Sequence, residues 1–373
     1  MMQQFHFATI IFVLIGSLIG GTYCRTSLAQ SGNGNNATVQ GQLAIIEGEV
    51  RLKPKGSLET CRVSVGARFR RGDLLEVPPS ARAVVVCADA TKHELKNGVH
   101  GLPCSPSNNQ SRVLLFDGAW VKVKPTRGEA STANIPIIVS PRKTKLLNAY
   151  PTLRWTRIVG ITNYVVNVRG WNLDWTTSVG SKTEIPYPQD QDKRLIPNVI
   201  YKLTVKAGKY SSDDEEAPDL FFSLLSPEDA RIVLTARQKI TALGLPEVAT
   251  KLLVAQLYAE SELSSEAIEQ LRSLPANRVE PAAAQLLGDL YFNIGLNRLA
   301  KEQYLMAVRL ADENQETISQ ARARSSLGHL YEIVGAKGDA IKYWQQAKEM
   351  YQRLADTEMV MKGEEALGRL NKP

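Results

Sequence analysis

Four residues whose side chains bind metals or form covalent bonds lie close together between positions 87 and 104. The stretch CADATKHELKNGVHGLPC holds Cys87, His93, His100 and Cys104. The two cysteines and two histidines could supply four zinc ligands, but they lack the closely paired spacing of a zinc knuckle. The residues between the cysteines are mostly polar or turn-forming, which favours a bridged loop. We therefore expect a Cys87–Cys104 disulfide, with zinc binding and free or differently paired thiols as alternatives.

Other residues suited to catalysis are sparse. The chain has only four histidines, and it contains no nucleophile elbow, phosphate loop, dinucleotide fingerprint or His-Glu-x-x-His motif. The adjacent carboxylates Asp213 and Asp214 belong to the acidic run SSDDEEAPD, and such a run is usually a solvated loop. The sequence therefore predicts no enzyme activity, no cofactor and no metal centre.

The tripeptide Arg71-Gly72-Asp73 could display an adhesion ligand or could only turn the chain. Leu75 and Val77 follow it with the alternation of a strand, and Gly-Asp is a common turn dipeptide. We expect a turn in which Asp73 supports folding, with receptor adhesion as the alternative.

The first 29 residues have the layout of a signal peptide. Residues 7–20 are an apolar run, and the small-residue stretch Ser27-Leu28-Ala29 is followed by polar, glycine-rich sequence. No Lys or Arg precedes the run, so an uncleaved anchor and a cytoplasmic location remain alternatives. We expect export to the periplasm or cell envelope, cleavage after Ala29, and no stable membrane span in the mature chain.

The formal net charge of +7 comes from basic residues scattered over the first two thirds of the chain. A nucleic-acid site needs a basic stripe with interleaved aromatic residues, which this distribution does not give. Weak attraction to an anionic envelope surface is the more economical interpretation.

Residues 37–128 are expected to form a small β domain, because short β-branched runs alternate with Gly, Pro and Asp every eight to twelve residues. Its stretches IIEGEVRL, VSVGARFRRGDLLEV and SARAVVVCADATKHEL resemble, in that order, the periplasmic β domain of the iron-dicitrate sensor FecR family. A last strand is expected in GAWVKVKP, around Trp120.

Residues 134–226 are expected to form a second β domain. The stretches YPTLRWTRI, TNYVVNVRG, LDWTTSVG and NVIYKLTVKAG read as strands, and Trp155 precedes Tyr164 and Tyr201 at a spacing typical of a sandwich. The segment resembles a fibronectin type III or immunoglobulin-like domain, in which an aromatic residue such as Tyr201 anchors a sheet corner.

Residues 227–373 are expected to be helical. Ser226-Pro227-Glu228-Asp229 combines an N-cap, a proline at the first position and acidic residues in the first turn. LLGDLYFNIGLNRLAKEQYLMAV and SLGHLYEIVGAKGDAIKYWQQAK then superpose with a 40-residue spacing, which pairs Gly288 with Gly328 and Tyr304 with Trp344. Because 40 residues is long for a pair of helices, we expect the helix through RLADENQETIS, or the connection after it, to be extended.

This pattern resembles the tetratricopeptide (TPR) repeat family, which implies a solenoid with a groove lined by the first helix of each pair. The repeat residues themselves are expected to pack in the core. The positions that should face the groove are Gln256, Glu260, Gln285, Asp289, Phe292, Asn293, Arg322, Ser325, His329 and Glu332.

The sequence thus predicts two small β-sandwich domains followed by an all-α TPR solenoid. The expected function is that of an exported, non-catalytic scaffold that binds a protein or peptide in the solenoid groove. Alternatively the basic β domains bind an envelope polysaccharide or an anionic surface, and the solenoid only spaces or dimerises the molecule.

Overall fold

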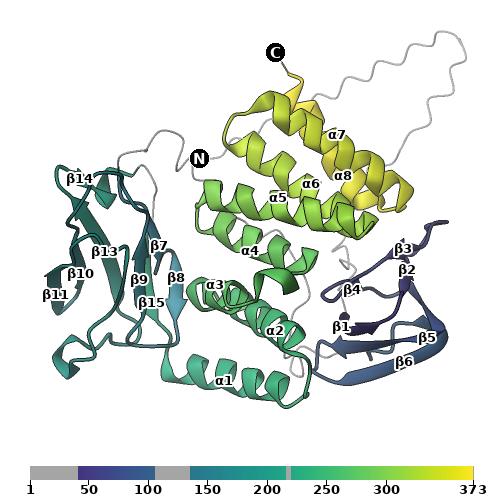
Figure 1. Cartoon of the computed structure of the whole chain (residues 1–373), viewed down its shortest axis with the longest axis horizontal. Helices are drawn as coiled ribbons and strands as arrows, with labels where there is room; N and C mark the ends of the chain where they lie inside the picture. Colours follow the sequence, from purple (N-terminus) through teal and green to yellow (C-terminus); the bar gives the residue numbers. More distant parts are fainter. Residues whose placement is uncertain (1–40, 106–134, 216–219, 373) are drawn as a thin grey trace, which may run out of the picture. The chain divides into compact units, whose positions relative to one another are not determined.

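The computed structural model describes residues 41–105, 135–215 and 220–372. The predicted signal peptide and the predicted strand around Trp120 lie outside these residues. Fifteen strands precede eight α-helices within the described residues, which confirms the predicted order of β and then α structure (Figure 1).

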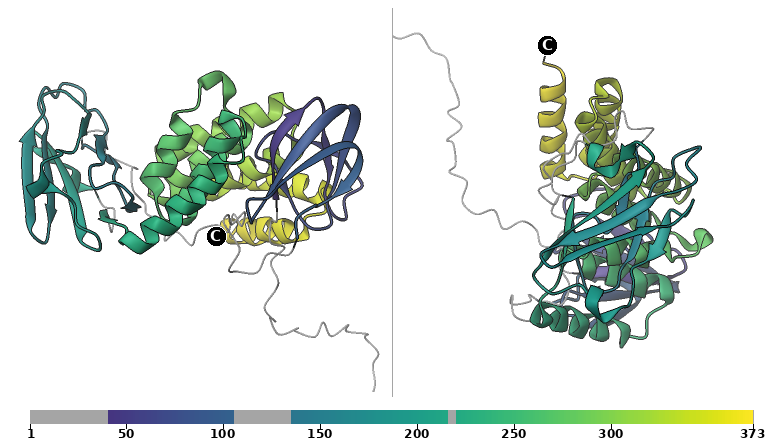
Figure 2. Two further views of the ribbon diagram at one scale, coloured as in Figure 1. Left: turned by 90° about the horizontal axis from the view of Figure 1, so that it is seen from below. Right: turned by 90° about the vertical axis from the view of Figure 1, so that its left-hand side faces the viewer.

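The sheet region, residues 41–105, forms one six-stranded sheet of order β3-β2-β5-β1-β4, with β6 paired to β5. Strand β5 pairs with β2 in its first part and with β1 in its second, and its register shifts between Val77 and Arg82, where two prolines follow Val77. The sheet therefore curls (Figure 2), and its two parts share a core that includes Leu52, Phe69 and Val85. The strands are β1 Gly41–Glu47, β2 Arg51–Lys53, β3 Cys61–Arg62, β4 Arg68–Phe69, β5 Leu74–Cys87 and β6 Lys92–Gly101.

The sandwich region, residues 135–215 and 220–225, contains two sheets. One has the order β11-β10-β13-β15-β8 with β14 on β13, and the other has the order β12-β9-β7. Residues from both sheets, among them Trp155, Val166 and Leu203, form one core. Tyr201 anchors a corner as expected, since its hydroxyl oxygen accepts a 2.8 Å hydrogen bond from the backbone N–H of Ile196.

The elements of the sandwich region are mostly short. The strands are β7 Ile138–Ser140, β8 Thr144–Leu146, β9 Thr152–Trp155, β10 Val165–Gly170, β11 Leu173–Ser178, β12 Glu184–Pro186, β13 Ile200–Ala207, β14 Tyr210–Ser211 and β15 Phe221–Leu224, with 3-10 turns at Gln191–Lys193 and Ser212–Asp214.

The helical region, residues 227–372, consists of consecutive helices that pack against one another. Ser226 caps the first helix as predicted, because its hydroxyl accepts the backbone N–H of Asp229 at 3.0 Å. The helices are α1 Pro227–Thr241, α2 Glu247–Glu260, α3 Ser264–Arg272, α4 Pro281–Asn293, α5 Asn297–Glu313, α6 Thr317–Ile333, α7 Lys337–Arg353 and α8 Thr357–Leu370, with a 3-10 turn at Ala276–Arg278.

The 40-residue spacing has a different origin from the one expected. Helix α5 ends at Glu313, and Gln315 has a φ of 59°, so RLADENQETIS spans a helix end and a helix start. Helix α6 contains 17 residues and α4 contains 13. The left-handed turn at Gln315 ends α5, so this helix does not run through the whole segment. The residues of the long repeat are therefore shared between α5 and α6, which each contain 17 residues.

Candidate functional site

All ten predicted groove residues lie on the first helices of the repeats. Gln256 and Glu260 lie on α2, Gln285 to Asn293 on α4, and Arg322 to Glu332 on α6. Their surroundings differ, and they divide into a buried set, a central charged cluster and a set at the C-terminal ends of α4 and α6.

The buried set is Gln256, Gln285 and Ser325. The Ser325 hydroxyl donates to the backbone oxygen of Arg322 at 2.8 Å, and the Gln285 amide donates to Ser326 Oγ at 2.9 Å. Gln285 thus joins α4 to α6, and all three side chains offer a partner little surface.

Asp289 is the centre of the charged cluster. Its carboxylate accepts hydrogen bonds from Gln285 Nε2 at 2.8 Å and from the Tyr304 hydroxyl at 3.0 Å, and it forms an ion pair with Arg322 at 3.2 Å. Burial and the adjacent Asp289 carboxylate raise the pKa of Tyr304 well above its usual value, which keeps the hydroxyl a donor. The cluster fixes this carboxylate between side chains of α4, α5 and α6.

A turn of the sheet region lies against this part of the groove. Gly66 has a φ of 94°, and a Cβ atom there would lie 2.5 Å from Ala282 Cβ and 2.6 Å from Leu252 Cδ2. Only glycine allows this approach of the turn to α2 and α4. Glu280, just before α4, accepts a hydrogen bond from Ser64 of the same turn, and burial raises its pKa.

Arg68, two residues beyond Gly66, faces the charged cluster. Burial and the nearby Arg322 lower the pKa of Arg68, while the carboxylates of Asp289 and Glu260 act in the opposite direction. Arg68 of the sheet region therefore lies within electrostatic range of three predicted groove residues. Arg68 is not among the predicted groove residues, because a basic residue in a short strand looks like an ordinary exposed one.

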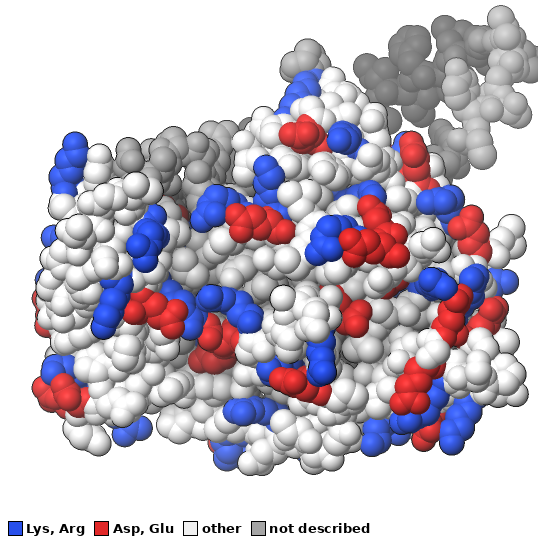
Figure 3. Space-filling view, viewed as in Figure 1, with Lys and Arg blue, Asp and Glu red and all other residues white. Residues whose placement is uncertain are grey.

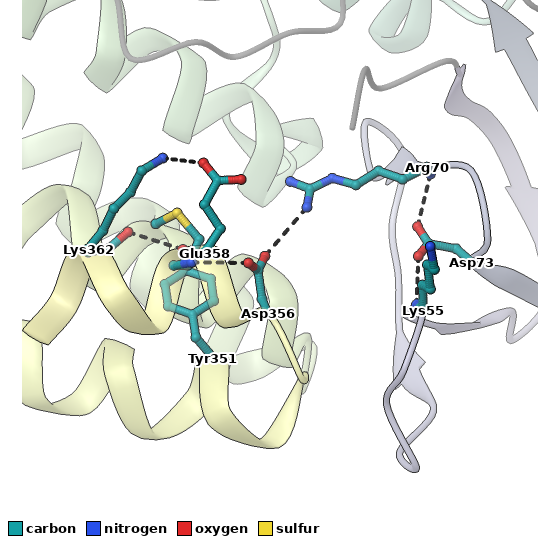
Figure 4. A network of polar contacts seen from close by, with 9 residues as sticks. Lys55, Arg70, Asp73, Tyr351, Asp356, Glu358 and Lys362 are labelled. Atoms are coloured by element: carbon teal, nitrogen blue, oxygen red, sulfur yellow. Dashed lines mark hydrogen bonds and ion pairs between the residues drawn. The ribbon is translucent and has the colours of Figure 1, made fainter. Parts of the chain in front are cut away.

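Further contacts extend from the sheet region to the last helices. The Ser57 hydroxyl donates to the backbone oxygen of Arg353 at 3.2 Å, and Arg70 lies 3.4 Å from Asp356 (Figure 4). Cys61 packs with Ala321 and Tyr351, and burial raises the pKa of its thiol. The sheet region thus contacts α2, α4 and α6 to α8.

The Arg71-Gly72-Asp73 turn does not display its carboxylate. Asp73 is 6% exposed and accepts the backbone N–H groups of Lys55 and Arg70, each at 2.9 Å (Figure 4). Gly72 has a φ of 94°, which suits a tight turn. The expectation that Asp73 is a turn residue is confirmed, and a ligand role would require this carboxylate to leave two hydrogen bonds.

The remaining predicted groove residues are Phe292, Asn293, His329 and Glu332. The rings of Phe292 and His329 meet edge to face at 5.3 Å, and burial lowers the pKa of His329. Glu332 forms an ion pair with Arg369 of α8 at 3.0 Å. Phe292 lies ten residues beyond Ala282 on α4, about 15 Å along the helix from the Gly66 contact.

The cysteine prediction is confirmed. Cys87, at the end of β5, and Cys104, beyond β6, form a disulfide with a Cα separation of 5.5 Å. Both sulfur atoms are therefore part of the disulfide, and neither cysteine can bind zinc as a thiolate. His93 lies near the Thr91 hydroxyl and His100 near the backbone oxygen of Lys96. Within the described ranges, no group of three or more His, Cys, Asp and Glu side chains is placed to hold a metal.

The acidic run is not fully solvated, contrary to expectation. Glu215 is buried and makes a two-point ion pair with Arg142, at 2.6 and 2.8 Å. Arg142 Nε also donates to the backbone oxygen of Ile294, at the end of α4, at 2.6 Å. The Arg142 guanidinium thus joins the sandwich region to the helical region, and the Glu215 carboxylate neutralises its buried positive charge.

Comparisons with known proteins returned weak similarities. No protein-family model matches the chain, and no curated protein does. Among solved structures, MamA protein is 20% identical over 38% of this chain and 77% of its own length, with a TM-score of 0.27. The FN1-FN3 domains of chicken CNTN1 are 14% identical over 47% of this chain and 50% of that chain, with a TM-score of 0.16. Neither assigns a function, and the resemblance to FecR domains stays a prediction.

No helix in the described part of the chain is both long and apolar enough to cross a membrane.

Proposed function

We propose that this chain is an exported, non-catalytic scaffold that binds a protein or peptide partner at the end of the helical groove formed by α4 and α6. The observation that carries the proposal is the close packing of the Gly66 turn on α2 and α4, where a Cβ atom on Gly66 would lie 2.5 Å from Ala282 Cβ, with Arg68 near the Asp289 cluster. Carboxylates such as Asp289 and Glu260 would favour an extended segment that carries a basic residue. In this chain the turn at Gly66, followed by Arg68, is such a segment.

The end of the groove offers similar chemistry to a second segment. The Phe292 ring is buried, the partly exposed His329 ring packs against its edge, and Glu332 adds a carboxylate that Arg369 orients. The partner is expected to be an extended segment with an apolar side chain next to a basic one, because these complement the His329 ring and the carboxylate.

Export is proposed on the basis of the Cys87–Cys104 disulfide together with the signal-like N-terminal sequence, since disulfides persist in oxidising compartments. The lack of enzyme activity is proposed because the sequence has no catalytic motif and the charged residues of the predicted groove are paired, Asp289 with Arg322 and Glu332 with Arg369. Asp289, for example, is held by three donors.

Attraction of the β regions to an anionic surface is the weaker candidate. On the face shown in Figure 3, Lys and Arg are interspersed with Asp and Glu. Several basic residues of the sheet region are also paired, for example Arg51 with Glu49 and Arg82 with Glu47. Such pairs leave little net field to attract an anionic surface.

Site-specific photo-crosslinking in the producing cells tests the proposal. A benzophenone side chain at Asn293 is expected to give one dominant protein adduct, and the same group at the exposed Glu313 of α5 is the matched control. Adduct formation at Asn293 should fall when Glu332→Lys is added, because the partner's basic residue would then be repelled. Identical adducts at both positions, or none at Asn293, would exclude partner binding at this end of the groove.

A further inference from the structure

A small pocket in the sandwich region lies beside a nearly fully exposed tryptophan. Trp171 is 84% exposed, in the turn that joins β10 to β11. Large aromatic side chains with this exposure commonly mark binding surfaces. The pocket has a volume of about 40 Å³, and its lining residues are Trp171, Asn172, Leu173, Asp192, Arg194, Ile196, Val199 and Tyr201.

Two tyrosines hold the walls of this pocket in place. A Cβ atom on Gly170 would lie 2.4 Å from Tyr201 Cδ1, so glycine is what allows the β10–β11 turn to lie on the Tyr201 ring. The Tyr201 hydroxyl accepts the Ile196 N–H at 2.8 Å, and the Tyr187 hydroxyl donates to the Lys193 backbone oxygen at 2.8 Å. The segment that carries Asp192, Arg194 and Ile196 is thereby fixed, and the pocket is preformed.

The chemistry of the lining selects a neutral, polar ligand with an apolar face. Asp192 and Arg194 line the same pocket, so it has no net charge and favours neither an anion nor a cation. Asn172 and Arg194 can donate hydrogen bonds, and Asp192 can accept them. A sugar ring matches this set, because its C–H face stacks on an indole and its hydroxyls both donate and accept.

The size of the pocket narrows the choice of sugar. A volume of about 40 Å³ exceeds the ~10–15 Å³ that one water needs, but it is far too small for a sugar ring. Leu173, Ile196 and Val199 make part of the lining apolar. A methyl-sized substituent of a ring stacked on Trp171 fits such a space. The acetamido group is a neutral sugar substituent that ends in a methyl, and its amide adds a donor and an acceptor for the polar lining.

We propose that Trp171 and this pocket bind a neutral polysaccharide that carries N-acetyl groups. The ring lies on the indole of Trp171, the acetamido methyl enters the pocket, and Asn172, Asp192 and Arg194 hydrogen-bond the polar groups. The site is separate from the helical groove, so its test does not depend on the proposed groove function.

The test uses the full chain labelled uniformly with ¹⁵N and titrated with oligosaccharides, in an NMR experiment that follows both backbone amide and tryptophan indole signals. The β-1,4-linked N-acetylglucosamine tetramer is the ligand, and the glucose tetramer of the same linkage lacks only the acetamido groups. The indole signal of Trp171, assigned from its loss in Trp171→Ala, is expected to shift with the acetylated tetramer, with an affinity at least tenfold higher than for the glucose tetramer.

Two variants separate the site from general surface effects. Trp171→Ala should leave the fold intact because the side chain is exposed, and it should abolish the shifts of backbone signals around Arg194. Val159→Ala removes a side chain of the same region that is 96% exposed, and it should leave binding unchanged.

Each other outcome contradicts part of the proposal. Equal affinity for the two tetramers would refute the acetamido assignment. An absence of shifts with either tetramer, or shifts that persist in Trp171→Ala, would refute the site. Binding of a proline-rich peptide at Trp171 without binding of either sugar would show that the pocket docks a peptide instead.

Discussion

Glu266, near the start of α3, shows how one side chain couples two parts of the molecule. Its Oε1 accepts the backbone N–H of Leu147, in the sandwich region, at 2.7 Å, while its Oε2 has no hydrogen-bond partner. Burial raises the pKa of this carboxyl to about 7. The charged form of Glu266 is therefore disfavoured at the contact between α3 and the segment after β8.

The stability of the protein is expected to fall as the pH rises through this window. Between pH 4.5 and about 7 the folded state holds a proton on Glu266 that the unfolded chain releases, so the free energy of unfolding falls across this range and stays lower above it. Glu266→Gln keeps an oxygen acceptor for Leu147 and removes the charge. We expect it to be more stable than the parent at pH 8 by about 1–2 kcal/mol and to differ little at pH 4, as measured by urea unfolding.

Glu364→Gln, an exposed change on α8, serves as the control for Glu266→Gln and should not alter the pH dependence. A Glu266→Gln protein that lost stability between pH 4 and 8 as the parent does would show that another group is responsible.

At the scale of elements, glycines set how closely the helices of each repeat pack. A Cβ atom on Gly288 of α4 would lie 2.5 Å from Tyr304 Cδ1 of α5, and one on Gly328 of α6 would lie 2.9 Å from Trp344 Cδ1 of α7. Gly368 of α8 occupies the same repeat position but has no atoms within 4 Å of such a Cβ. The repeat therefore pairs each packed glycine with one aromatic ring of the following helix.

The same Gly→Ala change is expected to have opposite effects at two repeat positions. Gly288→Ala should lower the free energy of unfolding by about 1–3 kcal/mol, because the new methyl overlaps the Tyr304 ring. Gly368→Ala should raise it by about 0.5–1 kcal/mol, because alanine favours the helix and meets nothing. Urea or thermal unfolding of both variants measures the difference, and a stabilising Gly288→Ala would contradict the packing described here.

At the scale of the whole molecule, close contacts attach both β regions to the helical region. The Gly66 turn packs on α2 and α4, and the buried Arg142 joins Glu215 to the end of α4. Buried charges of this kind need their partners, since removal of one leaves the other unpaired and desolvated.

Arg142→Met is expected to destabilise the protein by about 3–5 kcal/mol, because Glu215 would remain buried without a cation. Arg169→Met is the matched control, since Arg169 pairs with Asp174 in solvent and its side chain is 70% exposed, so its loss should cost at most about 1 kcal/mol. The double variant Arg142→Met/Glu215→Leu should recover part of the lost stability. Chemical denaturation of the three variants checks this order, and equal effects of Arg142→Met and Arg169→Met would contradict it.

The sequence by itself determined the features that depend on local periodicity and short-range spacing. These include the order of β and α elements, the N-cap at Ser226, the glycine and aromatic repeat of the helices, the turn at Asp73 and the Cys87–Cys104 pair. Each follows from strand alternation, helix periodicity or a closed loop, and so can be predicted without knowing what packs against it.

Only the tertiary structure decided what occupies the predicted groove and where the other exposed site lies. Arg68 is more than 180 residues from its partners in sequence, and Arg142 is 73 residues from Glu215. The Trp171 pocket likewise combines the tip of one hairpin with a turn 20 residues later. These neighbours are set by long-range packing between segments, and no short window of sequence contains both members of such a contact.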